Sequence, residues 1–226
     1  MDFDFLLDVV EYDDAEYFMD YAHEATFSLV DKEGENLLHY ACFQGCVNVI
    51  PLLFQCGINA RDKKGRTPLH RVWCGDRAAV VKLLLDAGAD INAQDNEGCT
   101  LLHRACYIGH LDVVKVLVER GANVNITDVA DELLFQELRL QVNCVDMLSK
   151  YKDGNTPLHL AALFDDRTDI ATLLLDHGAN VNAQNNMRAT PLAFALETKN
   201  EKMAKLLLNR GADPSIRPLQ PRWHLD

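Results

Sequence analysis

One segment recurs along this chain, and its recurrence constrains the fold more than any other feature of the sequence. The most regular copy runs from Asp95 to Asn125 and reads DNEGCTLLHRACYIGHLDVVKVLVERGANVN. A complete copy contains a turn that ends in glycine, a T-x-L-H motif, a short helix, a second turn led by glycine, a second helix and a closing Gly-Ala-Asp or Gly-Ala-Asn. Such a unit cannot bury its apolar face alone, so neighbouring copies must stack side by side.

The copies can be counted from the four-residue motif. It occurs as NLLH at 36–39, TPLH at 67–70, TLLH at 100–103, TPLH at 156–159 and TPLA at 190–193. The steps between the fourth positions are 31, 33, 56 and 34 residues, and the longest step indicates an insertion between the third and fourth copies. The pattern resembles the ankyrin repeat, whose period is about 33 residues and whose consensus contains T-P-L-H-x-A.

This resemblance implies an all-α solenoid of helix-turn-helix pairs with short β-hairpin fingers. We expect six repeats including two caps, which form one ankyrin repeat domain over residues 1–216. Within it, 1–30 forms an N-terminal cap, 129–151 is the insertion, and 186–216 forms a C-terminal cap. Residues 217–226 form a tail.

Two positions depart from the repeat pattern. Pro51 removes a backbone donor inside the second helix of its repeat, which predicts a kink or a late helix start. Trp73 stands where the pattern has a small alanine, so the local packing must open or the ring must turn outward.

The charge distribution indicates what kind of partner to expect. The net charge is −12, and residues 1–31 contain ten acidic side chains and no Lys or Arg. Such a field repels phosphate backbones, so nucleic acid is not an expected partner. We expect a protein partner that brings a basic surface near the N-terminal cap. The alternative is that the charge only keeps the cap soluble.

The cysteines and the start of the chain bear on location. Seven cysteines, at 42, 46, 56, 74, 99, 106 and 144, are odd in number and scattered, which indicates reduced thiols inside a cell. The chain starts with MDFDFLLDVV, which is unlike a signal peptide, and no apolar run approaches the roughly 20 residues of a membrane span. We therefore expect a cytoplasmic monomer without a membrane partner, with the nucleus or a host cytosol as alternatives.

No catalytic or metal site is expected. His39, His70, His103 and His159 recur at one repeat position, where the histidine of the resembled family ties a turn to a helix. Histidine followed three residues later by cysteine occurs twice, but no second pair stands at the spacing of zinc ligands. The sequence also lacks a phosphate-binding glycine loop and a nucleophile motif. We predict a protein that is not an enzyme and binds no cofactor.

The candidate partner-binding residues lie at the ends of the first helices and at the fingertips, which line the concave face in proteins that this chain resembles. Exposed aromatic side chains there are typical of an interface anchor, and the alternative is that their rings belong to the core. The helix-end candidates are Phe43, Gln44, Trp73, Cys74, Tyr107, Ile108, Leu163 and Phe164, and the fingertip candidates are Lys63, Lys64, Arg66, Asn96, Glu97, Met187 and Arg188.

The 129–151 insertion, VADELLFQELRLQVNCVDMLSKY, fits two structures. As a helix its apolar residues cover about two thirds of the circumference, and as a strand 137–145 alternates apolar and polar positions. We favour a helix, because Asp131 and Glu132 suit its start. We expect the insertion to bind the partner, the alternative being a lid on its own repeats. Its candidate contacts are Phe135, Leu138 and Val142.

Three asparagines suggest a modification. Asn92, Asn125 and Asn182 each follow a leucine by eight residues, which resembles the acceptor pattern of an asparaginyl hydroxylase that acts on ankyrin repeats. The alternative is purely structural hydrogen bonding, since asparagine favours such turns.

These observations together predict a noncatalytic protein-protein interaction module. We expect an adaptor or inhibitor that binds its partner on the concave face. The alternative is a secreted effector of an intracellular microbe or virus that binds a host protein.

Overall fold

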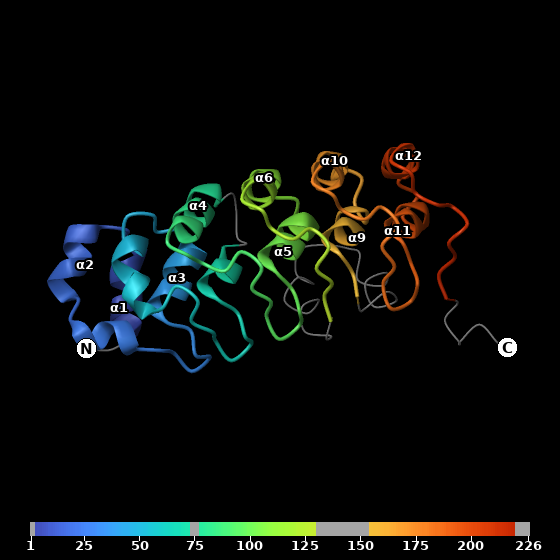
Figure 1. Ribbon diagram of the computed structural model, residues 1–226. Helices are drawn as coiled ribbons and strands as arrows, with labels where there is room; N and C mark the ends of the chain where they lie inside the picture. Colours follow the sequence, from blue (N-terminus) through green and yellow to red (C-terminus); the bar gives the residue numbers. More distant parts are fainter. Residues whose placement is uncertain (1–2, 73–76, 130–153, 220–226) are drawn as a thin grey trace.

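The computed structural model of the chain describes residues 3–72, 77–129 and 154–219. In this part of the chain six helix pairs follow one another along a single axis, with the two termini at opposite ends (Figure 1). The pairs are α1 (Phe3–Glu11) with α2 (Ala15–Tyr21), α3 (Leu37–Gln44) with the 3-10 helix η2 (Ile50–Cys56), the 3-10 helix η3 (Pro68–Arg71) with α4 (Ala78–Asp86), α5 (Leu101–Ile108) with α6 (Leu111–Glu119), α9 (Pro157–Ala161) with α10 (Thr168–Asp176), and α11 (Pro191–Glu197) with α12 (Glu201–Asn209).

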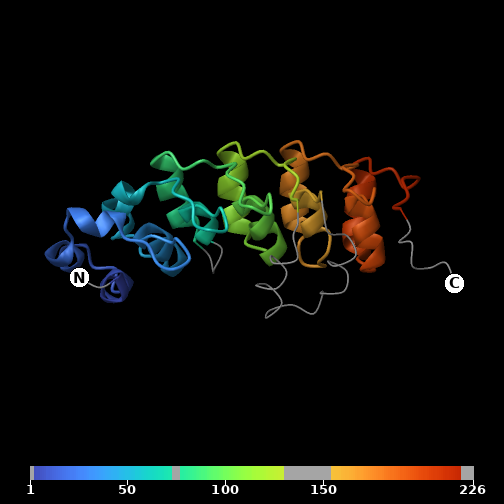
Figure 2. The ribbon, with the colours of Figure 1, turned by 90° about the horizontal axis from the view of Figure 1, so that it is seen from below.

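The helices form two rows, and the connecting fingers lie beyond the second row. Helices α4, α6, α10 and α12 make the outer row, and α3, α5, α9 and α11 lie between that row and the fingers (Figures 1 and 2). The apolar core runs unbroken between the rows, because each pair buries leucines against the next. The all-α solenoid predicted from the repeats is therefore confirmed. Fully or almost fully buried leucines of successive repeats include Leu38, Leu53, Leu84, Leu102, Leu117, Leu158, Leu174 and Leu207.

A histidine joins each first helix to the finger of the next repeat. In α5 the N–H of the N-cap residue Thr100 donates to His103 Nδ1 over 3.2 Å, and Thr100 Oγ1 lies 2.9 Å from the same nitrogen. Since Nδ1 accepts, the proton of the neutral ring lies on Nε2. This nitrogen lies 3.1 Å from the carbonyl oxygen of Ile126 and 3.2 Å from that of Asn155. One buried imidazole thus caps its own helix and bonds to the following finger.

The same arrangement recurs in three other repeats, so the predicted structural role of these histidines is confirmed. Each ring is buried and its Nδ1 lies 2.8 to 2.9 Å from the side-chain oxygen of its N-cap residue. Each Nε2 donates over 3.0 Å to a carbonyl oxygen of the next finger: His39 to Arg66, His70 to Cys99 and His159 to Ala189.

The fingers are short, as expected from the pattern. Asp62 N–H donates to the carbonyl oxygen of Arg66, and Asp95 N–H to that of Cys99, each over 3.0 Å. Within residues 3–72, 77–129 and 154–219 the only β-bridge is an isolated one between Val30 and Asn36. The fingers are hairpin turns that end before a ladder develops.

Pro51 distorts its repeat as predicted, and the distortion takes the form of a 3-10 helix. The second helix of this repeat, η2, includes Pro51 in its first turn and is tightened over its whole length. Its neighbour Leu52 donates its N–H to Val49 over 3.0 Å, a bond of the 3-10 type. The expected accommodation of Trp73 lies outside the described residues.

The N-terminal cap is attached by both packing and polar contacts. Leu6, Val10 and Phe18 of α1 and α2 are fully buried. Between these helices Asp13 adopts φ 51°, and its Oδ1 accepts the backbone N–H groups of Asn48 and Val49 over 2.8 and 3.1 Å. The carboxylate therefore connects the cap to the repeat that follows it. A further 3-10 turn, η1 (Glu24–Ser28), leads into the first finger.

The C-terminal end of the described chain follows the path of another finger. Leu219 N–H donates to the carbonyl oxygen of Met187 over 2.8 Å. This bond repeats the one that joins Asn96 N–H to Lys64 O between two complete fingers. Residues 213–219 therefore run alongside the last finger, although Pro214 and Pro218 interrupt regular structure. No helix in the described ranges combines the length and the apolar character that a membrane span requires.

Lowering the pH should destabilise the fold through its histidines. Burial lowers the pKa of His70, His103 and His159 to about 4, whereas the pKa of a histidine in an unfolded chain is about 6.5. Between these values the unfolded state binds protons that the native state does not bind. Each histidine then lowers the unfolding free energy by up to about 1.4 kcal/mol per pH unit as the pH falls.

Urea unfolding followed by circular dichroism at about pH 7, 6 and 5 measures this effect. The midpoint should fall with pH, and it should fall less steeply in His103→Gln, which has one titrating ring fewer. Equal wild-type midpoints at the two extremes would contradict the buried, neutral state of these rings.

Candidate functional site

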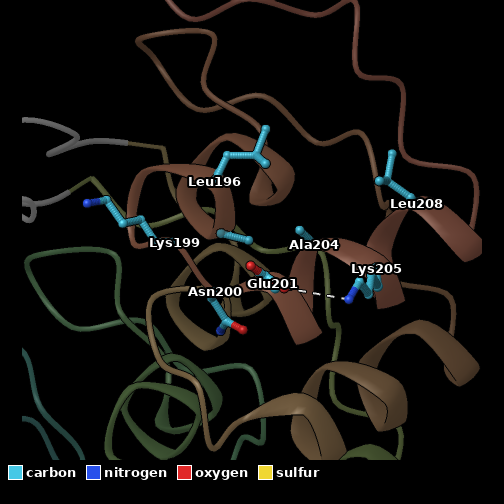
Figure 3. Close-up of a pocket in the computed structure, with 8 residues that line it drawn as sticks. Leu196, Lys199, Asn200, Glu201, Ala204, Lys205 and Leu208 are labelled. Atoms are coloured by element: carbon cyan, nitrogen blue, oxygen red, sulfur yellow. Dashed lines mark ion pairs between the residues drawn. The ribbon is translucent and has the colours of Figure 1, made fainter.

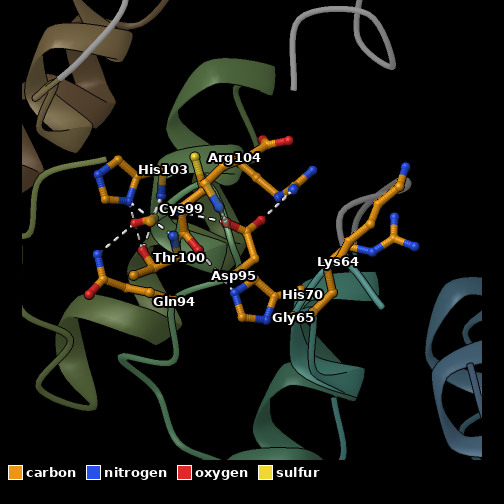
Figure 4. Close-up of polar contacts among 12 residues, drawn as sticks. Lys64, Gly65, His70, Gln94, Asp95, Cys99, Thr100, His103 and Arg104 are labelled. Carbon is orange, nitrogen blue, oxygen red and sulfur yellow. Dashed lines mark hydrogen bonds and ion pairs between the residues drawn. The ribbon is translucent and has the colours of Figure 1, made fainter. Parts of the chain in front are cut away.

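The candidate site is the inner face of the stack, formed by the first helices and the fingertips. Its fingers are built on a repeated aspartate or asparagine. Asp95 Oδ1 accepts the N–H groups of Glu97 and Cys99 over 3.0 and 2.9 Å (Figure 4). Its Oδ2 accepts from Arg104 Nη2 over 2.7 Å, and both side chains are less than a twentieth exposed. The finger is thereby anchored to α5, and His70 joins it to the preceding repeat.

Among the described residues, hydrogen bonds also join neighbouring fingertips. The side chains of Arg61 and Gln94 each donate to a carbonyl oxygen of their own finger and to one in the finger that follows. Because these bonds repeat along the stack, the side chains at the tips are held at a regular spacing. The backbone bonds run from Lys63 N–H to Glu33 O, from Asn96 N–H to Lys64 O, from Val129 N–H to Glu97 O and from Leu219 N–H to Met187 O, over 2.8 to 3.0 Å.

The insertion begins and ends at one of these fingertips. Asp128 N–H donates to Asn155 O over 2.9 Å, and Asn155 N–H donates to Asp128 Oδ1 over 2.8 Å. Asp95 and Cys99 make the same two bonds in the regular finger. The chain therefore leaves and rejoins the stack without altering the base of the finger. The helix or strand expected in 129–151, and the candidate contacts Phe135, Leu138 and Val142, lie outside the described residues.

The predicted contact Phe43 lies beside a cation. The Arg71 guanidinium carbon is 4.8 Å from the centre of the Phe43 ring, and Arg71 Nε lies 3.0 Å from Glu35 Oε1. Next to them Gln44 Nε2 donates to the Tyr40 hydroxyl over 3.1 Å. All five side chains are half-buried. The first complete repeats therefore present a ring, a guanidinium and an amide to solvent from a constrained arrangement.

Three of the predicted contacts are buried, so the expectation that they are exposed is wrong. Arg66 is at the base of its finger, where it pairs with Asp62 over 2.6 Å and with Glu35 over 2.7 Å. Tyr107 and Leu163 are 6% and 3% exposed because the stacking of α5 on α9 covers them. These three residues therefore lie beneath the inner face and do not form part of its surface.

Phe164 and Ile108 take part in the same packing but remain half-exposed. The Tyr107 and Phe164 rings meet edge to face, with centroids 5.3 Å apart. Arg167 crosses to the preceding repeat, where its Nη2 donates to Ile108 O over 2.7 Å, and its guanidinium carbon lies 5.3 Å from the Phe164 ring centre. It also lies against Gly109, where a Cβ would come within 2.2 Å of its guanidinium carbon. Trp73 and Cys74 lie outside the described residues.

At the fingertips Lys63, Asn96 and Arg188 are exposed, while Lys64, Glu97 and Met187 are half-buried. Arg188 adopts φ 57°, a backbone conformation that residues other than glycine rarely adopt. The described tips thus combine positive and negative side chains at regular intervals.

The three asparagines predicted as hydroxylation acceptors make bonds between repeats. Asn125 Oδ1 accepts the N–H of Asn180 over 2.8 Å, and its Nδ2 donates to Gly178 O over 3.0 Å. Asn182 bonds to the following repeat in the same way, and Asn92 Oδ1 accepts the N–H of Asn123. An enzyme acting on these side chains would have to break such bonds. Hydroxylation stays a prediction.

The donor chemistry of the inner face does not favour a metal. In the described ranges one group of three potential ligands, Asp95, Glu97 and Cys99, has its donor atoms within 4.8 Å of one another. Asp95 already accepts two backbone N–H groups and the Arg104 guanidinium. Burial raises the pKa of the Cys99 thiol well above its ordinary value, which disfavours the thiolate that a metal needs.

A hollow of about 190 Å³ lies at the C-terminal end, on the outer face of α11 and α12 (Figure 3). Its apolar lining includes Leu196 and Leu208, which are 56% and 45% exposed. Cys42, Cys106 and Ala162, which are equivalent to Leu196 in three earlier repeats, are completely buried because the next repeat packs on them. The hollow is therefore the uncovered end of the stack. Lys199 and Glu201 are exposed beside these leucines, so the predicted C-terminal cap is only partly polar.

Comparison with known proteins agrees with this construction. A family model of ankyrin repeats, in three copies, matches residues 7–95, 52–128 and 130–218. The chain belongs to the ankyrin repeat family. Ankyrin repeats are generally protein-protein interaction modules, and domains built from them are typically noncatalytic.

The chain matches parts of proteins of several kinds. The chain is 30% identical to the transient receptor potential cation channel subfamily A member 1 of Drosophila melanogaster over 200 residues, which is 88% of the chain and 15% of the channel. It is 49% identical over 67 residues to the ankyrin repeat and LEM domain-containing protein 1 homolog of Caenorhabditis elegans, covering 29% of the chain and 10% of that protein. A putative ankyrin repeat protein of fowlpox virus is 41% identical over 49 residues, covering 22% and 19%. The chain thus spans less than two thirds of the length of each.

Replacing Asp95 should separate the two functions of its carboxylate in this ankyrin finger. Asp95→Asn keeps an oxygen for the two backbone donors but removes the charge that pairs with Arg104. Asp95→Ala removes that oxygen as well. Both variants leave the buried Arg104 cation without its counter-charge, so we expect Asp95→Asn to lower the unfolding free energy by about 3–5 kcal/mol and Asp95→Ala to lower it by about 1–3 kcal/mol more. Chemical denaturation compares the two, and equal losses would contradict the assigned role of the backbone bonds.

Proposed function

We propose that this ankyrin domain is a noncatalytic adaptor or inhibitor that binds a protein partner through its inner face. The observation that carries the proposal is the row of fingertips, bonded from one repeat to the next. A row held in this way loses little conformational entropy when a partner docks, which favours affinity. The proposal also agrees with the general role of ankyrin repeats as interaction modules.

The proposed contacts are the sequence candidates without the three buried residues and without those that lie outside the described residues. Phe43 is the proposed anchor, because it is a ring stacked with Arg71 and is already partly desolvated. The charged fingertips form the rim, where they set orientation and association rate more than affinity. The proposed set is Phe43, Gln44, Lys63, Lys64, Asn96, Glu97, Ile108, Phe164, Met187 and Arg188.

We propose that the 129–151 insertion adds to this surface, since Asp128 and Asn155 hold its two ends at a fingertip. Replacing residues 129–153 with the dipeptide Asn-Glu recreates the regular tip between Asp128 and Gly154. The shortened protein should keep its melting temperature within a few degrees and lose partner affinity. Retention of full affinity by the folded, shortened protein would remove the insertion from the site.

A location inside a cell is part of the proposal. Cys42, Cys46, Cys56, Cys99 and Cys106 are free thiols, a state that a reducing compartment preserves. The similarity to a fowlpox virus protein favours a second candidate, an effector that binds a host protein. Affinity purification from cells of the source organism and from host cells distinguishes the two by the origin of the captured partner.

The anchor role of Phe43 can be measured once that partner is purified. Phe43→Ala removes the ring that stacks with Arg71 and should weaken binding about tenfold or more, equivalent to about 1.4 kcal/mol. Biolayer interferometry gives the dissociation constant, and the circular dichroism spectrum should be unchanged.

The matched control lies on the outer row of helices. Lys82 and Lys115 are exposed on α4 and α6, and the double variant Lys82→Glu/Lys115→Glu should bind within about twofold of wild type. The fingertip double variant Lys63→Glu/Lys64→Glu should instead change the association rate and its salt dependence. A stronger effect from the outer row than from the inner face would refute the proposed surface.

A further inference from the structure

The N-terminal cap carries a continuous row of four aromatic rings, here called the aromatic row. It runs from Phe5 on α1 through Tyr21 and Tyr17 on α2 to Tyr12, which follows α1. Successive ring centroids are 5.2, 5.1 and 5.8 Å apart, and the rings meet edge to face. Tyr12 is 73% exposed, Phe5 40% and Tyr17 37%. The row is therefore ordered by its own ring contacts while much of its area faces water.

Other residues form the buried core of the cap, and of the four rings only Tyr21 packs against it. Leu6, Val9, Val10 and Phe18 fill the interior and are at most 1% exposed. The aromatic row lies on surface that no described repeat covers. Contiguous apolar area of this kind is uncommon on a soluble monomer and marks an interaction site. Tyrosines suit such a site, because each offers a large apolar face and a polar end.

Carboxylates lie beside the rings. Asp8 and Glu11 line a hollow of about 390 Å³ together with Tyr12. Asp14 lines a second hollow of about 300 Å³ together with Tyr12 and Tyr17. Tyr12 is thus shared by two adjoining hollows, each of which combines an aromatic face with at least one carboxylate.

No cation of the described chain neutralises this surface. Residues 1–31 contain no Lys or Arg, and none of the ion pairs among the described residues involves Asp8, Glu11 or Asp14. Nucleic acid and anionic membranes would be repelled by it. The complementary occupant is cationic and has an apolar stem.

We propose that the aromatic row binds a linear, Lys- and Arg-rich segment of a partner protein. The cation of a Lys or Arg side chain gains energy over an aromatic face within about 6 Å of its centre, and its stem packs on the ring. The two hollows that share Tyr12 hold neighbouring basic side chains of one extended segment, while Asp8, Glu11 and Asp14 pair with their charges. The rings supply the apolar contact area, and the carboxylates make the site selective for a basic segment.

This site is separate from the inner face and extends the proposed function to a second surface. The anchor proposed there is Phe43 on α3, whereas the aromatic row lies on α1, α2 and the turn between them. Failure at one surface leaves the other untouched, so variants of the two distinguish which proposal fails.

Fluorescence anisotropy with a labelled eight-residue peptide of alternating Arg, Lys and Gly tests the proposal on the full chain. The wild type should bind this peptide, but not a control in which Gln replaces each basic residue. Tyr12→Ala should weaken binding about fivefold, and Tyr12→Phe should preserve it because the aromatic face remains. Tyr12 is so exposed that neither change should lower the melting temperature.

Two matched controls separate recognition from net charge. Asp8→Asn/Glu11→Gln should weaken binding and flatten its salt dependence more than Asp20→Asn/Glu24→Gln, which removes the same charge from residues that line neither hollow. Met19→Ala, an exposed apolar residue on α2, should bind like wild type, as should Phe43→Ala.

Three results would overturn the proposal. Equal binding by Tyr12→Ala and wild type would show that the row does not contact the peptide, and equal effects of the two charge variants would show unspecific attraction. Sedimentation velocity that reveals concentration-dependent dimers lost in Tyr12→Ala would assign the row to a second copy of this chain instead.

Discussion

A neutral imidazole shared by two repeats is the contact on which the rest of the structure depends. Stacking of helix pairs buries apolar area without direction, so it does not by itself determine the distance between fingers. The histidine adds direction, because His103 accepts from Thr100 with one nitrogen and donates into the next finger with the other. A protonated ring has no acceptor for the Thr100 N–H. Regular stacking therefore requires rings that are buried and uncharged.

The fingers, in contrast to the uncharged histidines, are held together by charged side chains. Asp95 is almost fully buried, which costs solvation free energy, but it receives two backbone N–H groups and a guanidinium. Buried ion pairs add little net stability compared with apolar packing and are better understood as determinants of a specific arrangement. In the preceding finger Asp62 pairs instead with Arg66 of its own finger, and Arg66 also pairs with Glu35 of the finger before that. The polar network thus specifies the alignment of the tips, while the leucines between the helix rows supply most of the stability.

Much of this could be predicted from the sequence because the repeat supplies its own comparison. The period, the helix pairs and the role of the histidines all follow from positions that recur. The exposure of individual site residues could not be predicted in the same way. Arg66 is buried because Glu35, 31 residues earlier, lies within 2.7 Å, and the repeat pattern gives no information about that pairing. Tyr107 is covered by Phe164, from a repeat that follows the insertion. The sequence also does not separate the aromatic row from the core of the cap, because both lie in the same short segment; the packing shows that Leu6, Val9, Val10 and Phe18 form the core.

The insertion begins and ends at Asp128 and Asn155, which are bonded to each other as in an uninterrupted finger. The entropy of closing a loop grows only with the logarithm of its length, so a long excursion from such a closed base costs little more than a short one. Changes of sequence or length inside the excursion therefore have little leverage on the stability of the stack. Selection can alter what this fingertip displays while the scaffold beneath it stays the same, much as an antibody framework tolerates variation in its loops.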